Sequence, residues 1–571
     1  MFFKKPDIVL LHAPSVYDFR RLTTVPSPLS DLIPSTPAFE IYPIGFTFLG
    51  EYLERNHINT RIVNLAQRMI EDPKFDVPRF LSELEPIAFG IDFHWLTHAQ
   101  GALEIARLLK EIHPSIPVIF GGYSATYFHR ELMEYPQVDY VLRGDSTEEP
   151  LRMLVEAIGL KGFLGDIPNL TFRDSSGQVM ENSLTYIPAS LEYLGNNYKY
   201  MISSALKYGD WKSLYAFWNW HEYPITMVPT CRGCSSDCAF CGGSKTAVAD
   251  YCGREQIAFR PPEKIAYDIE LLSHFSSAPI FIVGDLLQAG RDYAMETLEL
   301  ISHLDPKNHI IFELFAPAPR EYYERIASDL DHFDFQISPE THDEEIRAFI
   351  NKPYSNEELE HNIAWALEAG AERFDIFFMI GLPGQTRDSI METVNYCGEL
   401  LRNFGPRLNP SIGPLAPFID PGSAYYRRPE RYGYHLIHRT LDDYVRASYS
   451  PHWRDMLGYE TRWLSRQDIV DVTYEALLAL NTIKAKNGLV SPEHAALNDR
   501  RLKDTISLLK MVDDIMNITD SKLRLTELEK VHQESQQLAQ QLYLPKEELM
   551  WPLTGARFKR INILRILMGW I

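Results

Sequence analysis

The sequence predicts an α/β protein in three parts: a doubly wound parallel sheet, a partial (β/α)6 barrel and a helical carboxyl-terminal region. Two observations carry this prediction. Short apolar runs alternate with amphipathic helical stretches up to about residue 160, and the alternation resumes at Pro224 through six strand–helix units. Parallel strands need a crossover connection, usually a helix, so such alternation is typical of parallel sheets. We expect domains at 1–160, 224–430 and 431–571, with a connector at 161–223.

The first predicted domain alternates strands and helices in a regular order. "DIVLLHAP" ends in proline and predicts a buried strand, and "IGFTFLGEYLERNH" has the spacing of an amphipathic helix. Four more runs predict strands: 60–66, 87–94, 117–124 and 138–145. Two further helices are expected at 99–114 and 148–159. Ligands of a doubly wound sheet bind beyond the carboxyl ends of its strands, so the residues at those ends are candidates.

The residues at these strand ends include His12, Asp92, His94, Gly121, Gly122, Gly144 and Asp145. The two adjacent glycines allow the backbone to approach a ligand closely, because neither has a Cβ, although a tight turn needs the same residues. His94 and His98 follow a strand that ends near Asp92. They are candidate ligand contacts, or else histidines that hydrogen-bond within the protein.

The stretch 161–223 predicts a connector that contains a hairpin turning at Ser175-Ser176-Gly177. The barrel strands are expected at 225–230, 278–285, 309–317, 333–340, 373–384 and 410–420. Amphipathic helices are expected between them at 262–275, 293–304, 356–370 and 387–401. Six units amount to a TIM-like barrel without the last two of eight repeats. Its chemistry should lie at the carboxyl ends of the strands.

The composition is that of an acidic globular protein. The net charge is -21, with 45% hydrophobic and 23% charged residues. Nucleic-acid binders usually carry a basic surface, so no nucleic-acid partner is expected. The first residues, "MFFKKPDIVLLHAPS", lack the pattern of a signal peptide, and no apolar stretch reaches the roughly 20 residues of a spanning helix. We therefore expect a cytoplasmic protein.

Four of the six cysteines lie within "TCRGCSSDCAFCGG", residues 230–243. Clustering of this kind indicates a metal centre in a reducing compartment rather than disulfides. Only three residues separate Cys234 from Cys238, whereas zinc sites usually place a dozen or more between their pairs. Three close thiolates, Cys234, Cys238 and Cys241, can hold three irons of a [4Fe–4S] cube and leave the fourth open. A zinc knot, and a closed cluster with Cys231 as fourth ligand, are the alternatives.

The spacing Cys-x-x-x-Cys-x-aromatic-Cys, after the first strand of a six-unit barrel, resembles the radical SAM enzymes. "PTCRGCSSDCAFC" is similar to the form found in the subgroup with an amino-terminal cobalamin-binding domain, in which Cys231 replaces a serine and is interpreted as a non-ligand. Further segments resemble the family in the same order: "GGYSATYF", "RGDSTEEPL", "SPETHDEEIRAFINKPYSNEEL", "GLPGQT" and "APFIDPGSAYY". The resemblance spans residues 5 to about 430 and implies a Rossmann-like cobalamin-binding domain before a radical SAM barrel.

The resemblance implies three cofactors: a [4Fe–4S] cluster, S-adenosylmethionine and cobalamin. In the family the open iron binds the amino and carboxylate groups of S-adenosylmethionine. One electron, expected here from a flavodoxin or ferredoxin, then yields a 5′-deoxyadenosyl radical. The residues implied to bind S-adenosylmethionine are Phe240, Gly284, Asp285, Ser338, Glu340, Gly381 and Pro383. Those implied to bind cobalamin are His94, Gly121, Gly122, Gly144 and Asp145. Asp285 and Glu340 suit an ammonium group and ribose hydroxyls respectively, but each is also placed to cap a helix.

Two features depart from the family pattern. The second-strand G-G-E, which holds the methionine amino group in the family, is reduced here to Gly284-Asp285. The D-x-H-x-x-G loop after the first strand, which gives a histidine to cobalt in some cobalamin proteins, is replaced by "LHAPSVYDF". We therefore expect cobalamin without a histidine from that loop on cobalt, or a domain that no longer binds cobalamin.

The resemblance implies an enzyme that methylates an unactivated carbon, or forms or cyclises carbon–carbon bonds there, in a small molecule or a lipid. No residue is assigned as catalytic. The last segment, "ARFKRINILRILMGWI", is basic and apolar, which predicts peripheral membrane contact or a helix docked on the protein's own core. Membrane contact would suit a lipid substrate. The alternative from another class is a zinc-stabilised protein that binds a corrin or a nucleotide without radical chemistry.

Overall fold

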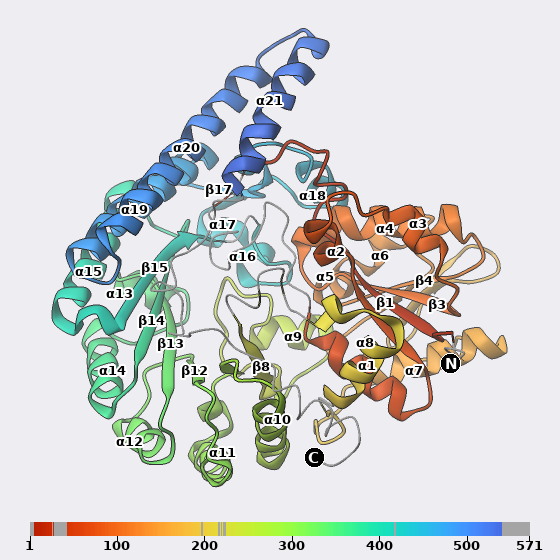
Figure 1. Cartoon of the computed structure of the whole chain (residues 1–571), viewed down its shortest axis with the longest axis horizontal. Coiled ribbons are helices and arrows are strands. Elements are labelled where there is room, and N and C mark those ends of the chain that lie inside the picture. Colours follow the sequence, from red (N-terminus) through yellow and green to blue (C-terminus); the bar gives the residue numbers. More distant parts are fainter. Residues whose placement is uncertain are drawn as a thin grey trace.

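The computed structural model describes residues 5–25, 27, 43–195, 198–214, 217, 220, 224–415 and 418–539. Two sheets flanked by helices make up most of this part of the chain, and a helical arm extends from one side (Figure 1). The fold class expected from the sequence is confirmed: a doubly wound sheet comes first, a partial barrel second and a helical region last.

The first sheet has seven strands in the order β2-β1-β3-β4-β5-β6-β7. They are β1 (Ile8–His12), β2 (Thr60–Asn64), β3 (Ala88–Asp92), β4 (Val118–Gly121), β5 (Tyr140–Leu142), β6 (Leu170–Arg173) and β7 (Val179–Glu181). The first five strands are parallel. Alternate residues of β1 enter two different apolar cores, one containing Val9 and Leu11 and the other Ile8 and Leu10. Both faces are therefore buried, which explains the unbroken apolar runs in the sequence.

Helices cover both faces of this sheet. They are α1 (Gly45–Arg55), α2 (Leu65–Glu71), α3 (Val77–Ser82), α4 (Ala99–Ile112), α5 (Tyr123–Tyr127), α6 (His129–Leu132) and α7 (Glu148–Leu160). The strand order reverses between β1 and β3, because β2 lies on the other side of β1. This switch point is where ligands of doubly wound sheets bind.

The hairpin of β6 and β7 extends the first sheet. It pairs antiparallel to β5, with Thr171 opposite Val141, and turns at Gly177, which has a φ of 85°. Sequence analysis predicted the hairpin but placed it in a connector, since the local pattern does not reveal which sheet edge a hairpin will join. Helix α8 (Tyr198–Tyr208) and the 3-10 helix η3 (Trp211–Leu214) follow and pack against β2.

The second sheet is the partial barrel, with six parallel strands in the order β15-β14-β13-β12-β11-β8. They are β8 (Thr226–Pro229), β11 (Ile280–Val283), β12 (Ile310–Leu314), β13 (Phe333–Glu340), β14 (Arg373–Ile380) and β15 (Leu408–Pro414). The connecting helices include α9 (Lys245–Cys252), α10 (Pro262–Phe275), α11 (Arg291–Leu304), α12 (Arg320–Asp329), α13 (Glu344–Phe349), α14 (Asn356–Ala369) and α15 (Arg387–Phe404). The strands form an arc with α10, α11, α12 and α14 on its outer side (Figure 1).

The carboxyl-terminal region closes over both sheets. It contains α16 (Ala424–Arg427), α17 (Pro429–Tyr432), the hairpin of β16 (Tyr434–Leu436) and β17 (Tyr459–Thr461), α18 (Leu441–Ala447), α19 (Arg466–Lys486), α20 (Pro492–Met516) and α21 (Ser521–Ala539). Helix α19 packs on α15 and β15, whereas α18 packs on α4 of the first sheet. The predicted helical character is confirmed, and the region links the two halves of the molecule.

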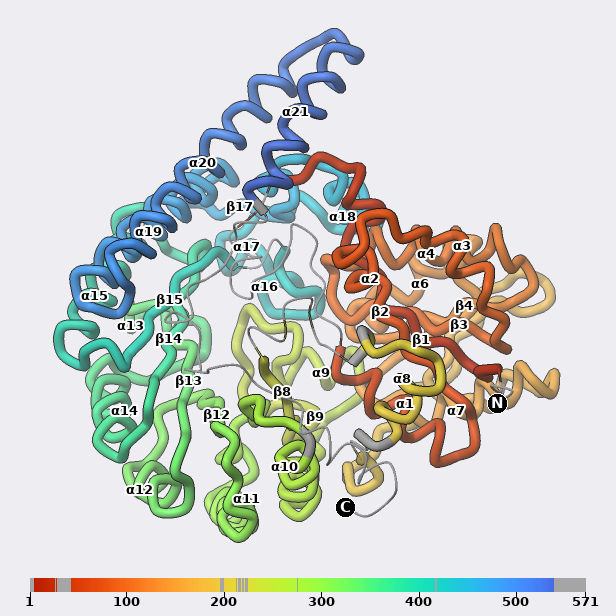
Figure 2. The backbone as a smooth tube through the Cα atoms, viewed as in Figure 1, coloured from red at the N-terminus to blue at the C-terminus, as the bar shows by residue number. Residues whose placement is uncertain are grey.

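The amino-terminal segment lies against the last described helix. Thr23 Oγ1 donates to the Leu528 carbonyl at 3.1 Å, and the His532 ring nitrogen contacts the Arg20 carbonyl at 3.2 Å. Ser535 also donates to the Thr24 carbonyl. Figure 2 shows this red segment of the tube running to α21. Within the described residues, no helix is long and apolar enough to cross a membrane. The basic and apolar segment 556–571 lies outside the described residues.

Candidate active site between the two sheets

The cysteine loop, residues 230–243, directly follows β8 at the carboxyl end of the barrel strands. Cys231 and Arg232 form the short strand β9 (Cys231–Arg232), which pairs antiparallel with β10 (Ala258–Phe259). All four cysteines of the loop are free and partly buried. The Cys234 sulfur accepts the Ser236 backbone N–H at 3.4 Å, and the Cys241 sulfur accepts the Gly243 N–H at 3.3 Å. Hydrogen bonds of this kind to sulfur are typical of iron–sulfur ligands.

The chemistry of these thiols fits a cationic cluster. Burial raises the pKa of Cys234, Cys238 and Cys241 above the ordinary value, and the Asp420 carboxylate and then the neighbouring thiols raise that of Cys241 further. A buried thiolate needs a compensating positive charge, which coordinated iron supplies. A zinc ion would need its ligands to converge on one point at about 2.3 Å. In the part of the chain that the structure describes, no three His, Cys, Asp or Glu side chains converge in this way. A cube, whose irons each take one thiolate, does not require it.

Gly284 is shaped by close contacts at the end of β11. Its φ is 93°, and a Cβ at this position would lie 2.5 Å from Thr230 Oγ1 and 3.5 Å from the Cys231 sulfur. Its N–H donates to Glu313 Oε2 at 2.7 Å. Sequence analysis missed Glu313, a half-buried carboxylate whose pKa is raised by burial. The sequence does contain a sign of it, because Glu313 is the one acidic residue within the mostly apolar strand "HIIFELFAP".

Asp285 caps a short helix, which is the alternative role expected from the sequence. One carboxylate oxygen accepts the Leu287 N–H at 2.9 Å, at the start of the 3-10 helix η4 (Leu286–Ala289), and the other accepts the Phe315 N–H at 3.0 Å. Both oxygens are thus engaged by the backbone of this chain. A contact from Asp285 to S-adenosylmethionine stays a prediction, and these bonds do not favour it.

Glu340 ends β13 in a left-handed conformation, with a φ of 69°, and is buried. The register between β13 and β14 shifts between Ile337 and Glu340. Glu340 Oε1 pairs with Lys352 Nζ at 2.6 Å, and Lys352 also donates to the Ser338 carbonyl. Burial alone would lower the pKa of Lys352, but the Glu340 carboxylate more than offsets this and raises it. Strained residues of this kind are often found at functional sites.

Lys352 connects this pair to the cysteine loop. Its Nζ lies 5.6 Å from the centroid of the Phe240 ring, and its positive charge lowers the pKa of Cys238 against the effect of burial. The predicted residues Phe240, Ser338 and Glu340 therefore meet around one ammonium group. Sequence analysis did not single out Lys352, because a lysine after a helix is usually solvated and no local pattern reports its burial.

The turn at Gly381 and Pro383 follows β14. Gln385 Oε1 accepts the Gly381 and Leu382 N–H groups, both at 2.8 Å. The Gly381 φ is 98°, and a Cβ there would lie 2.9 Å from the Tyr459 hydroxyl oxygen. The turn is therefore held from within the protein, as the compact loop alternative requires. Its contact with adenine stays a prediction.

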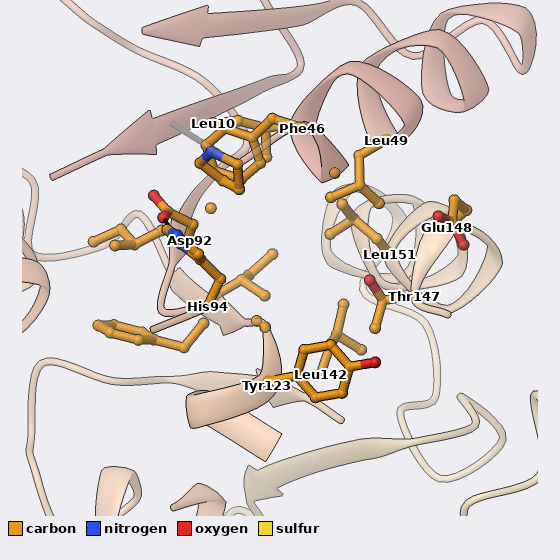
Figure 3. A pocket seen from close by; sticks show the side chains of 18 of the residues that line it. Leu10, Phe46, Leu49, Asp92, His94, Tyr123, Leu142, Thr147, Glu148 and Leu151 are labelled. Carbon is orange, nitrogen blue, oxygen red and sulfur yellow. Dashed lines mark hydrogen bonds and ion pairs between the residues drawn. The ribbon is translucent and has the colours of Figure 1, made fainter. Parts of the chain in front are cut away.

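The five residues expected to bind cobalamin all line one pocket with about 810 Å³ of empty space, called here the sheet-edge pocket. They are His94, Gly121, Gly122, Gly144 and Asp145. The pocket lies at the carboxyl end of the first sheet, at its switch point, and its walls include the apolar side chains of Leu10, Phe46, Leu49, Leu142 and Leu151 (Figure 3). Arg232 of the cysteine loop also lines it. The five residues are brought together as predicted, whereas their contact with cobalamin stays a prediction.

The two glycines differ in their surroundings. A Cβ on Gly122, whose φ is 114°, would lie 2.6 Å from the His94 Cα and 2.7 Å from its nitrogen. A Cβ on Gly121 would meet only the Leu142 carbonyl oxygen, at 3.9 Å. Gly122 therefore serves the turn, as the alternative interpretation proposed, and Gly121 leaves open space toward the pocket.

A buried carboxylate holds two histidines at this switch point. Asp92 Oδ2 lies 2.6 Å from His94 Nδ1, and both Asp92 oxygens lie 3.1 Å from His12 Nδ1. The His98 ring packs at a tilt against both, with ring centroids 5.0 Å from His12 and 5.1 Å from His94, and its Nδ1 contacts the Ala13 carbonyl. Asp92 thereby fixes the orientation of the His94 ring beside the pocket.

Buried ion pairs join the sheet-edge pocket to the barrel. Asp145 binds Arg254 through both oxygens, with Nη2–Oδ1 at 3.0 Å, and both side chains are buried. Glu148 binds Arg232, which also donates to the Ser146 hydroxyl at 2.9 Å. The carboxylate of Asp145 is therefore engaged by the barrel. Sequence analysis missed both arginines, because their partners lie more than 80 residues away.

A second pocket, called here the bridging pocket, has about 750 Å³ of empty space between the two sheets. His94 and Tyr123 line both pockets. On the barrel side the lining includes Gly242 and Gly243, which follow Cys241 directly, and Asp420 after β15. The bridging pocket therefore extends from the sheet-edge pocket to the cysteine loop.

Comparisons with known proteins agree with this arrangement. Residues 228–397 match the radical SAM superfamily, and residues 32–152 match the B12 binding domain. The solved structure of the radical S-adenosylmethionine methyltransferase TsrM from Kitasatospora setae, with cobalamin and a [4Fe-4S] cluster bound, has a TM-score of 0.59 at 14% identity, covering 94% of this chain and all of that one. That of the cobalamin-dependent S-adenosylmethionine radical enzyme OxsB has a TM-score of 0.56 at 13% identity, covering 100% and 79%.

Curated relatives are distant in sequence. Hopanoid C-3 methylase of Methylococcus capsulatus is 24% identical over 268 residues, which are 46% of this chain and 45% of that protein. Cytidylyl-2-hydroxyethylphosphonate methyltransferase of Streptomyces wedmorensis is 21% identical over 454 residues, 69% of this chain and 81% of that protein. The match therefore spans less than half the length of the hopanoid enzyme.

A B12-binding sheet followed by a radical SAM barrel, with the cysteine loop facing the first sheet, defines a cobalamin-dependent radical SAM enzyme. The chain carries both domains of this class, and its sequence relatives include a protein named as a methylase and one named as a methyltransferase. Its cofactors are a [4Fe–4S] cluster, S-adenosylmethionine and cobalamin. The expectations of family, fold and cofactors are thus confirmed.

Proposed function

We propose that this enzyme methylates an unactivated carbon of a small, largely apolar molecule bound in the bridging pocket. One observation carries the proposal: the bridging pocket shares His94 and Tyr123 with the sheet-edge pocket and reaches the glycines beside Cys241. A substrate there would lie between the two cofactors. When bound, the cluster with S-adenosylmethionine supplies a hydrogen-abstracting radical, and cobalamin supplies the methyl group.

The chain's own residues would hold and shield the reactants. Cys234, Cys238 and Cys241 would bind the cluster, with Lys352 balancing charge beside Cys238. The open side of the sheet-edge pocket would receive cobalamin over Gly121, with Asp92 fixing the His94 ring. The aromatic lining of the bridging pocket would exclude water, so that a reactive radical meets only its substrate.

The test uses full-length protein reconstituted anaerobically with iron, sulfide and cobalamin. The enzyme is given S-adenosylmethionine with a trideuterated methyl group, a flavodoxin as the proposed electron donor, and small-molecule and lipid extracts of the source cells. Mass spectrometry should find a trideuteromethyl product and 5′-deoxyadenosine, both lost in Cys241→Ala. 5′-Deoxyadenosine without a labelled product would overturn methylation and support bond formation or cyclisation instead.

A membrane lipid is the second candidate substrate. The basic and apolar segment 556–571 supports it, and the match to a protein named hopanoid C-3 methylase is in keeping with it. Basic residues near an anionic leaflet contribute roughly 1 kcal/mol each, so the four in this segment favour reversible attachment. Full-length protein should then sediment with anionic vesicles at low salt, and protein ending at Gly555 should not. Equal sedimentation of the two would remove this support.

A further inference from the structure

The walls of the bridging pocket are aromatic and come from both halves of the molecule. Trp95, which follows β3, packs edge to face on Phe418, which follows β15, with ring centroids 6.2 Å apart. Tyr127 packs on Tyr251 across the same boundary at 4.8 Å. All four rings line the pocket. Walls of this kind suit an apolar ring system, which buries its faces against theirs.

One carboxylate in this lining is less engaged than its neighbours. Asp420 follows β15, and its Oδ2 accepts the Gly242 N–H at 2.9 Å. Among the residues described by the structure, this N–H is the only hydrogen-bond donor to the Asp420 carboxylate, and no ion pair reaches it. A Cβ on Gly242 would lie 3.1 Å from the Asp420 Cβ and 3.0 Å from the Pro421 carbonyl. The glycine thus allows Asp420 to lie against the cysteine loop.

The other carboxylates near the two pockets already have charged or ring partners. Asp92 faces His12 and His94, Asp145 binds Arg254, and Glu148 binds Arg232. Two hydroxyls of the bridging pocket are also directed to backbone: Thr126 Oγ1 donates to the Gly122 carbonyl at 2.8 Å, and Ser124 lies 3.5 Å from the His94 carbonyl. Asp420 is therefore the carboxylate that has an oxygen left for a bound molecule.

A half-buried carboxylate with one neutral donor selects the charge of its ligand. Oδ2 of Asp420 accepts the Gly242 N–H, and Oδ1 accepts no hydrogen bond among the described residues. A hydroxyl or ammonium donor would satisfy its remaining oxygen, whereas an anionic group would be repelled. Phosphate- or carboxylate-bearing ends of a substrate are therefore not expected at this position.

We propose that the substrate combines an apolar ring body with a hydroxyl or ammonium donor, and that Asp420 accepts this donor while the four rings hold the body. The inference rests on the proposed function, since it assumes that the bridging pocket is the substrate site. It adds the chemical class of the substrate and the residue that orients it. Asp420 would thereby position the substrate next to Cys241, because Gly242, whose N–H donates to Asp420, directly follows that cysteine.

The test measures binding, not turnover, with three small bicyclic probes of matched shape: 2-aminoindane, 2-indanol and 2-methylindane. Equilibrium dialysis uses full-length protein reconstituted with iron, sulfide and cobalamin. We expect the amine and the alcohol to bind about tenfold more tightly than 2-methylindane, which corresponds to about 1.4 kcal/mol. Asp420→Asn should reduce the preference for the amine to about twofold and leave 2-methylindane unchanged.

Two further variants separate recognition from folding. Trp95→Ala should weaken all three probes by a similar factor and keep the donor preference. Asp250→Asn is the matched control, because Asp250 pairs with Arg427 outside the pocket and undergoes the same change of group. It should behave as the unmodified protein. Iron and cobalamin content, measured for each variant, identifies any loss of the folded site.

Equal binding of the three probes, no binding of any, or an unchanged preference in Asp420→Asn with normal cofactor content would each overturn the proposal. Because dialysis needs no methyl transfer, its outcome is independent of the labelling experiment. A donor preference lost in Asp420→Asn, together with failure of the methyl assay, would retain the recognition and refute the proposed reaction.

Discussion

The two adjacent glycines of the sheet-edge pocket allow a matched test of how this pocket is built. Gly122→Ala would place a Cβ 2.6 Å from the His94 Cα, at a φ of 114° that L-residues rarely adopt. Backbone strain of this kind costs about 1–3 kcal/mol, and overpacking adds about 1–3 kcal/mol. We therefore expect the first sheet to lose about 2–6 kcal/mol of stability in the cofactor-free protein.

Gly121→Ala should behave in the opposite way. Its Cβ would meet only the Leu142 carbonyl oxygen, at 3.9 Å, so stability should change by less than about 1 kcal/mol. The added methyl group would instead occupy space in the sheet-edge pocket, where cobalamin is expected. This variant should unfold as the unmodified protein does but retain less cobalamin through gel filtration.

The assay combines urea unfolding, followed by circular dichroism, with cobalamin retention measured by absorbance. The reasoning predicts opposite rankings: Gly122→Ala is the less stable variant, and Gly121→Ala is stable but weak in cobalamin binding. Full stability of Gly122→Ala would show that the backbone of His94 can move aside. Full cobalamin retention by Gly121→Ala would show that the corrin does not lie over this strand end.

Three further predictions follow from the site. Single changes of Cys234, Cys238 or Cys241 to Ala should lower iron from about four per chain to near zero, while Cys231→Ala keeps it; stoichiometric zinc in anaerobically purified protein would contradict this. Lys352→Met should lower the free energy of unfolding in urea by about 3–5 kcal/mol, because it leaves buried Glu340 without its partner. Adding Glu340→Gln should recover part of this loss. An equal loss in the double variant would refute the pairing. Burial raises the pKa of Asp285 to about 6 from 3.8, so the folded state binds the proton more tightly than the unfolded state. The free energy of unfolding should therefore fall as the pH rises from about 4 to 6. In Asp285→Asn this fall, measured by unfolding at each pH, should be smaller by about 3 kcal/mol.

The order of strands and helices could be predicted because each leaves a local pattern. The buried runs of β1 and β3, and the helical spacing of α4 and α14, depend only on residues close in the sequence. The cysteine loop was equally visible, since its three proposed ligands lie within eight residues. The chemistry of the strand ends could also be anticipated, because parallel strands bring their carboxyl ends to one edge.

Contacts between distant segments left no such pattern. Arg254 reaches Asp145 across 109 residues, and Asp420 reaches Gly242 across 178. Lys352 looked like an ordinary lysine until the fold placed it beside Glu340. Asp285 shows the converse case. Its position at a strand end predicts a ligand contact, which stays a prediction, and the structure adds two details: the backbone N–H groups of Leu287 and Phe315 each donate to one of its oxygens.

The contact between the amino-terminal segment and α21 has a consequence for how the chain is made. Thr23, Thr24 and Arg20 are joined to residues that lie 505 to 512 positions later. A ribosome adds residues at about 5–20 per second, so this segment waits tens of seconds for its partner while the sheets behind it can already form. Once both segments exist, closing so long a loop costs little more than closing one half its length. The two segments therefore meet only after more than 500 residues have been added between them.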